Sequence, residues 1–181
     1  VSVTADRALQ ALSRSGWDGV AFELLHPAQT EPGGPPNARS CVLRVAGRGG
    51  SVLLAGDIEA LQELRLVERV GTGLAADVLL VPHHGSKTSS TPVFVQQVHP
   101  KWALVQAGYR NRFHHPAPSV TQRYQAEGVR IVRTDACGAW HWSSAQAAGW
   151  CTRALAPRYW HAPTSIAATG EDPSAPDPVW P

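Results

Sequence analysis

The stretch that decides the fold is ADVLLVPHHGSKTSS, residues 76–90, where an apolar run ends in two histidines, a glycine and a cluster of hydroxyls around one lysine. The run ADVLLVP has the length of a strand and is apolar after Asp77, as expected for a strand covered on both faces. A second apolar run, SVLLAGDIE at residues 51–59, ends in Gly56 and the carboxylate of Asp57. Both runs predict buried strands that present polar side chains where they end.

Strand and helix patterns alternate along the rest of the chain. A GRGG linker between the β-rich runs 40–46 and 51–57 predicts a β-hairpin. Residues 58–70 form an amphipathic pattern, ended by Gly71, that predicts a helix. This alternation predicts a mixed α/β layered fold. Further strands are predicted at 18–27, 102–108, 129–135 and 138–144, further helices at 90–100 and 117–128, and the apolar positions of the first helix are Ile58, Leu61, Leu64, Val67 and Val70.

Length and composition limit the class of protein. A chain of 181 residues suits one domain, and no apolar stretch approaches the roughly 20 residues that span a bilayer. The net charge of +2 is too small to indicate a nucleic-acid partner by itself. Because the chain starts at Val1 and has no methionine, we expect it to be a segment of a longer protein. Residues 1–160 are predicted to be folded, and residues 161–181 to be a disordered Pro/Ala-rich tail.

The three cysteines do not form a CxxC pair, which argues against a structural zinc site. Cys41 lies in an apolar run and is predicted to be a buried free thiol. Cys137 and Cys151 can pair if they lie on neighbouring strands, and such a loop closure would stabilise the fold by about 3 kcal/mol. The spacing leaves both the paired and the free state open.

Asp57 and His83 both follow an apolar strand, and functional groups gather where the strands of such folds end. A carboxylate and an imidazole at neighbouring strand ends can hold a divalent metal ion such as zinc or manganese. Successive residues of a regular strand point to opposite sides, so we predict His83 as the ligand and His84 as its neighbour. The alternatives are that Asp57 caps the following helix and that the histidines are a surface feature.

Two other polar stretches complete the candidate site. GYRNRFHHP, residues 108–116, supplies Asn111, Arg112 and His115, which either bind phosphate or complete the pocket, or form a polar turn. Lys87 and the serines beside it either bind phosphate or cap the helix that follows. The tryptophans are predicted to pack in the core or at its edges rather than to stack on bases; they are Trp17, Trp102, Trp140, Trp142 and Trp150.

A family resemblance rests on five motifs that occur in order along the chain. Together they resemble the C-terminal portion of the metallo-β-lactamase-like domain of ComEC-type DNA internalisation competence proteins, over roughly Trp17 to Trp160. The resemblance implies the C-terminal half of an αββα sandwich. The motifs are NARSCVLRV (37–45), SVLLAGDIE (51–59), ADVLLVPHHGSKTSS (76–90), NRFHHP (111–116) and RTDACGAWHW (133–142).

The resemblance implies a role in natural transformation. Such a protein lies in the bacterial inner membrane, with this domain on the periplasmic side, and passes one DNA strand inward. The domain would hydrolyse the other strand with divalent zinc or manganese, held as a binuclear centre. Its partners would be DNA, the membrane channel of the same protein and competence DNA-receptor proteins. By motif position, Asp57 and His83 would be metal ligands, and His84, Lys87 and His115 would act in catalysis.

One departure from the family pattern is expected to matter. The metal-binding signature HxHxDH of this fold is absent from these 181 residues. With two ligands alone, we expect this segment to bind metal poorly and to be inactive by itself. The alternatives are a non-catalytic DNA-guiding module and another phosphoesterase of the metallo-β-lactamase fold, since a fold does not determine a substrate.

Overall fold

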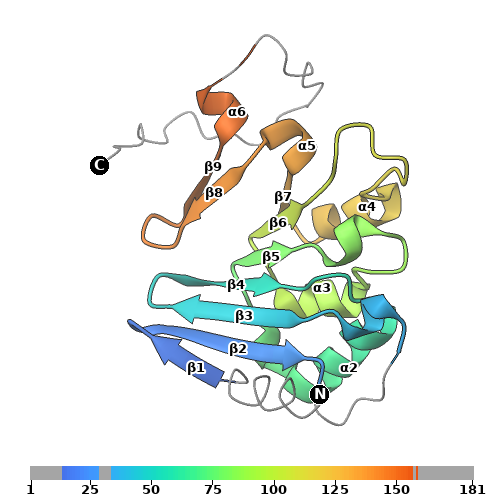
Figure 1. The fold of residues 1–181 in the computed structure, drawn as a ribbon, viewed down its shortest axis with the longest axis vertical. Coiled ribbons are helices and arrows are strands. Elements are labelled where there is room, and N and C mark those ends of the chain that lie inside the picture. The colour runs from blue at the N-terminus through green and yellow to red at the C-terminus, as the bar shows by residue number, and fades with distance from the viewer. Residues whose placement is uncertain (1–13, 29–33, 157, 159–181) are drawn as a thin grey trace, which may run out of the picture.

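A seven-stranded mixed sheet forms the centre of the protein in the computed structural model, which describes residues 14–28, 34–156 and 158 (Figure 1). The strands lie in the order of the sequence. Neighbouring strands from β1 to β4 pair antiparallel, and those from β4 to β7 pair parallel. The strands are β1 (Arg14–Trp17), β2 (Val20–His26), β3 (Val42–Gly47), β4 (Gly50–Leu54), β5 (Val78–Leu80), β6 (Trp102–Val105) and β7 (Arg130–Arg133).

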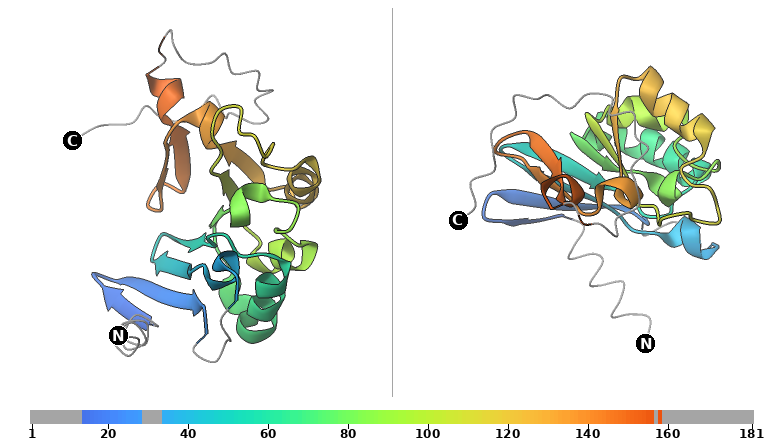
Figure 2. Two further views of the ribbon diagram at one scale, coloured as in Figure 1. Left: turned by 45° about the vertical axis from the view of Figure 1, so that its right-hand side comes forward. Right: turned by 90° about the horizontal axis from the view of Figure 1, so that it is seen from above.

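Three helices gather on one side of this sheet, as both views in Figure 2 show. They are α2 (Ala60–Val70), α3 (Pro92–Val98) and α4 (Pro118–Ala126), and they follow β4, β5 and β6. Their buried side chains form one core with Leu53, Leu79 and Ala103 of the central strands. This arrangement confirms the mixed α/β prediction. A sheet with helices on one face also corresponds to half of an αββα sandwich.

The other face of the sheet carries a separate hairpin. It consists of β8 (Trp140–Ser143) and β9 (Ala148–Cys151), flanked by the short helices α5 (Thr134–Cys137) and α6 (Thr152–Leu155). Trp102 in β6 points away from the core residue Ala103, and its ring centroid lies 5.5 Å from that of Trp140. The aromatic contact therefore joins the hairpin to the sheet. In the described ranges no helix has the length and apolar character needed to cross a membrane.

The helix after β4, α2, buries a different side from the one that the sequence predicts. Leu61 and Leu64 are exposed, whereas Gln62, Glu63 and Leu66 are buried. The predicted apolar positions recur every three residues, and a helix has 3.6 residues per turn, so they cannot all share one face. The helix begins at Ala60, with Glu59 as its N-cap. The alternative that Asp57 caps this helix is therefore wrong.

Other differences lie at the edges of the predicted elements. Cys41 is exposed because β3 begins one residue later, so the predicted buried thiol is wrong. The strands β1 and β9 were not predicted from the sequence. Trp17, at the end of the edge strand β1, is 80% exposed, so it does not pack in the core. The predicted tail at 161–181 lies outside the described residues.

A disulfide joins Cys137 and Cys151 across the base of the hairpin, and the two cysteines are 14 positions apart along the chain. We expect the double variant Cys137→Ser, Cys151→Ser to lower the free energy of unfolding by about 3 kcal/mol, because the unfolded chain loses a loop constraint. Urea denaturation at fixed pH measures this change. The matched control is Cys41→Ser, an exposed thiol. Equal stability of the double variant and that control would contradict the prediction.

Candidate functional site

The two consecutive histidines lie in one left-handed turn directly after β5. This short 3-10 turn, η3, spans Pro82–Gly85, and both histidines have positive φ: 47° at His83 and 55° at His84. Histidine adopts this region more readily than most residues, but at a cost on the order of 1 kcal/mol or more. The backbone N–H of His83 donates to the carbonyl of Gly56 at 2.9 Å, which attaches the turn to the end of β4. The prediction that these residues continue a regular strand is wrong.

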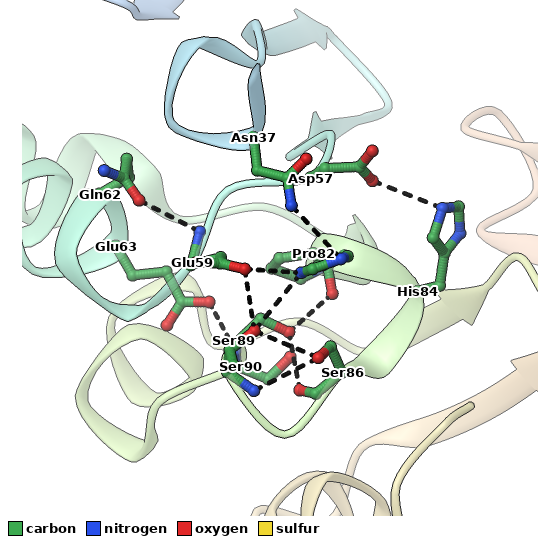
Figure 3. A network of polar contacts seen from close by, with 12 residues as sticks. Asn37, Asp57, Glu59, Gln62, Glu63, Pro82, His84, Ser86, Ser89 and Ser90 are labelled. Carbon is green, nitrogen blue, oxygen red and sulfur yellow. Dashed lines mark hydrogen bonds and ion pairs between the residues drawn. The ribbon is translucent and has the colours of Figure 1, made fainter. Parts of the chain in front are cut away.

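His84 faces Asp57 across the ends of β4 and β5 (Figure 3). Its Nε2 lies 3.4 Å from Asp57 Oδ1, and its Nδ1 lies 3.0 Å from the carbonyl oxygen of Gln106. A carbonyl only accepts, so the proton is on Nδ1, and in the neutral ring Nε2 presents a lone pair to the carboxylate. Two electron-pair donors face each other, so a shared cation, either a proton or a metal ion, would satisfy both.

His83 has a different carboxylate partner. Its Nδ1 lies 3.2 Å from Glu59 Oε1, and Thr88 Oγ1 donates to the same oxygen at 3.1 Å. On the other side of the ring, Asn37 Nδ2 lies 3.5 Å from Nε2. The carboxylate therefore fixes the orientation of the imidazole, as carboxylates beside metal-ligating histidines do.

His115 completes the group of imidazoles from a third loop. Its ring centroid lies 6.2 Å from that of His83, and its buried Nδ1 has no hydrogen-bond partner among the described residues. Burial lowers the pKa of His115 below its ordinary value, and the nearby charges of His83 and His84 lower it further. Asn111 holds its backbone: Oδ1 accepts from the N–H of His115 and Nδ2 donates to its carbonyl, both at 2.8 Å.

The serines of the loop after the turn have a structural role. Ser86, Ser89 and Ser90 are buried, and Ser89 Oγ donates to the carbonyl oxygens of Pro82 at 2.8 Å and of Ser86 at 3.1 Å. Ser89 therefore stabilises the loop, and phosphate binding by these serines stays a prediction. Lys87, in the same loop, is exposed to solvent.

Sequence reasoning missed Glu63 as well as Glu59, the partner of His83. The carboxylate of Glu63 is fully buried and accepts from the backbone N–H groups of Ser90 at 2.5 Å and Thr91 at 2.7 Å. Arg123 stabilises the same loop by donating to the carbonyls of Ser89 and Ser90, both at 3.0 Å. The signal was present in the sequence, because Glu63 lies three residues before Leu66, on the face of α2 that is buried.

The described residues supply an incomplete donor set for a metal ion. Asp57 and His84 are two donors aimed at one point, whereas a catalytic zinc site takes three protein ligands and a water. Within residues 14–28, 34–156 and 158, no group of three or more His, Cys, Asp or Glu side chains is arranged to hold a metal. The chain thus brings together Asp57, His83, His84 and His115, but these do not form a closed metal centre.

The chain is similar in sequence to curated bacterial proteins, one of which is named a competence protein. It is 42% identical over 129 residues to "Competence protein ComA" of Neisseria gonorrhoeae and 41% identical over 117 residues to "ComE operon protein 3" of Bacillus subtilis. It is 38% identical over 122 residues to "Recombination protein 2" of Haemophilus influenzae. These matches cover 71%, 65% and 67% of the chain, but only 18%, 15% and 15% of the relatives.

Two further comparisons complete this picture. No protein-family model matches the chain. Among solved structures, it is similar to a "Putative metal-dependent hydrolase" from Parabacteroides distasonis, with 15% identity and a TM-score of 0.41. That likeness covers 71% of this chain and 61% of the other.

Proposed function

Since this chain is homologous to a segment of the ComEC-family competence proteins, we propose that it is part of a DNA-uptake protein and acts in phosphodiester hydrolysis. The chain spans less than a fifth of the length of those relatives, so the proposal concerns one portion of a larger protein. Its substrate would be the DNA strand that is not imported. Its other partners would be the membrane channel of the same protein and the competence receptors that deliver DNA.

The observation that carries the proposal is the pair of Asp57 and His84. An imidazole whose Nδ1–H is held by a backbone carbonyl, and whose Nε2 lies 3.4 Å from a carboxylate oxygen, presents two donors to one cation. The carboxyl ends of parallel strands are where ligand sites form in such sheets. His83 and His115 lie beside this pair, which gives the site further groups that can bind a phosphate.

A divalent zinc or manganese ion at such a centre would supply an activated water and stabilise negative charge on the phosphate. The described residues lack the full set of metal ligands. The remaining ligands of this ion, and the ligands of a second ion, would come from residues outside them. Asp57 is proposed as one ligand. His84 is closer to Asp57, whereas His83 is held by Glu59, and both imidazoles stay candidates for the second ligand.

The remaining site residues would act on the substrate. The lowered pKa of His115 keeps its imidazole neutral at neutral pH, so it can accept or transfer a proton. Lys87 is exposed in the loop beside the turn and can place an ammonium group against a DNA phosphate. We place the site on the extracytoplasmic side of the inner membrane, because the Cys137–Cys151 disulfide is typical of an oxidising compartment.

A nuclease assay on the intact protein tests the proposal. We expect DNA cleavage that requires manganese or zinc, and that falls by about 100-fold or more in the variant that lacks the true histidine ligand. His83→Ala and His84→Ala, compared side by side, identify that ligand by metal stoichiometry. His99→Ala is the matched control, because His99 is exposed at the end of α3.

A non-catalytic DNA-guiding module is the second candidate function, and the incomplete donor set favours it. If the intact wild-type protein cleaves no DNA with any divalent metal, and DNA uptake survives both histidine variants, this second function is correct. Cleavage of small phosphoesters in preference to DNA would instead indicate another phosphoesterase of the same fold.

A further inference from the structure

The loop between β6 and α4 carries two exposed aromatic side chains next to the candidate site. Tyr109 is 59% exposed and Phe113 is 62% exposed, although large aromatic rings usually contribute to a core. Each ring lies beside an arginine. The guanidinium carbon of Arg110 is 5.2 Å from the centroid of Tyr109, and that of Arg112 is 4.7 Å from the centroid of Phe113.

The loop contacts the candidate site through one of its two aromatic rings. Phe113 stacks on His115, with a centroid distance of 5.7 Å and an angle of 17° between the rings, and His115 is the neighbour of His83. The amide of Asn111 bridges the backbone of His115 and also donates to the carbonyl of Gly108 at 3.4 Å. Phe113 therefore lies against the imidazole of His115, and Tyr109 lies four residues earlier on the same loop.

The charge of this region matches an anionic partner. Residues 106–126 contain three arginines and no aspartate or glutamate. Arg110 and Arg112 are exposed, and Lys87 is exposed on the neighbouring loop. The two loops are joined where the backbone N–H of Ala117 donates to the carbonyl of Gly85 at 2.8 Å.

We propose that residues 108–115, the stacking loop, bind unpaired nucleotides beside the candidate site. Tyr109 and Phe113 would stack on bases, and Arg110 and Arg112 would contact the flanking phosphates. The face of a base is free only outside a duplex, so this surface selects single strands or frayed ends. The inference rests on the proposed function, because it names the form in which that site receives DNA.

Binding of a fluorescent single-stranded oligothymidine, measured by anisotropy with EDTA present, tests this inference without any contribution from cleavage. We expect Tyr109→Leu and Phe113→Leu each to weaken binding on the order of 10-fold, because one stacked base is lost. Arg110→Gln and Arg112→Gln should each lower the salt dependence by about 0.7 in the logarithmic slope. A duplex of the same sequence and an abasic strand of the same length should both bind more weakly than the oligothymidine.

Matched controls separate stacking from general effects. Trp17→Leu removes a more exposed aromatic from the edge strand β1, and Arg48→Gln removes an exposed arginine from the β3–β4 turn; both should leave binding unchanged. Equal binding of the abasic strand and oligothymidine would overturn the proposal. So would loop variants that bind the oligonucleotide normally but lose binding to phosphatidylglycerol vesicles, because the surface would then contact membranes.

The result is distinguishable from a failure of the proposed hydrolysis. If the intact protein cleaves no DNA but the loop variants lose binding to single strands, the stacking loop stands and the hydrolysis proposal fails. If the intact protein cleaves DNA and the loop variants bind single strands as the wild type does, only the stacking loop fails. Circular dichroism should be unchanged in all these variants, since each altered side chain is exposed.

Discussion

Replacement of Asp57 by Asn will weaken divalent metal binding by the intact protein by at least about 100-fold, and DNA cleavage will fall with it. Asn keeps the shape of the side chain but removes the negative charge that faces His84 Nε2 at 3.4 Å. The neutral amide is a poorer donor for zinc or manganese than the carboxylate. Isothermal titration with manganese measures the affinity directly, without any need for a substrate.

The control for Asp57→Asn is Asp18→Asn. Asp18 is exposed in the turn between β1 and β2 and has a φ of 50°, a conformation that asparagine also adopts readily. This variant should bind metal and cleave DNA as the wild type does. Unchanged metal affinity in Asp57→Asn, with the fold intact, would remove Asp57 from the proposed ligands. In that case the contact with His84 would be an ordinary ion pair.

Replacement of Glu63 by Ala should lower the free energy of unfolding by about 4 kcal/mol, the largest loss of stability that we expect from a single change. The carboxylate accepts two backbone hydrogen bonds, from Ser90 and Thr91, and each buried N–H left without an acceptor costs about 1–3 kcal/mol. The cavity left by the side chain adds to this loss. Urea denaturation measures it, with Glu68→Ala, an exposed position on the same helix, as the control.

The same residue gives the stability a defined pH dependence. Burial raises the pKa of Glu63 above its ordinary value of 4.5, although hydrogen bonds from Thr91 and Ser90 and the charge of Arg123 oppose this rise. In the pH range above 4.5 the folded protein therefore keeps a proton that the unfolded chain releases. The contribution of Glu63 to stability is fully present below pH 4.5 and is lost as the pH rises through the folded pKa.

The variant Glu63→Gln isolates this effect, because glutamine does not titrate. Above pH 4.5 the stability of the wild type should fall relative to that of Glu63→Gln as the pH rises. Denaturation curves for both proteins at several pH values provide the comparison. A constant difference between them across that range would show that Glu63 has the same pKa in the folded and unfolded states.

Local sequence patterns were sufficient to predict the framework of the site. The apolar runs that end before Asp57 and His83 are the parallel strands β4 and β5, and the predicted helices that follow β4, β5 and β6 lie on one face of the sheet. Apolar runs are informative here because a strand that is covered on both faces is apolar along nearly its whole length. Pro92, in the second predicted helix, was an equally reliable signal, because proline is favoured at the first helical position, where it lies in α3.

The pairing of side chains within the site could not be predicted in the same way. The left-handed turn at His83 depends on a backbone hydrogen bond to Gly56, which lies 27 positions earlier in the chain. In this turn His84, rather than His83, faces Asp57. The buried side of α2 was likewise misassigned, because the period of three in its apolar residues does not match a helix. The side of α2 that is buried is the side that packs against the core.

The backbone hydrogen bonds between the loops of the site have a consequence for local unfolding. The amide of His83 is bonded to the end of β4, and that of Ala117 is bonded to Gly85 in the histidine turn. Neither amide can exchange its hydrogen with solvent unless the loops separate from each other. These loop amides should therefore exchange slowly, within the same cooperative unit as the central strands rather than with the exposed turns.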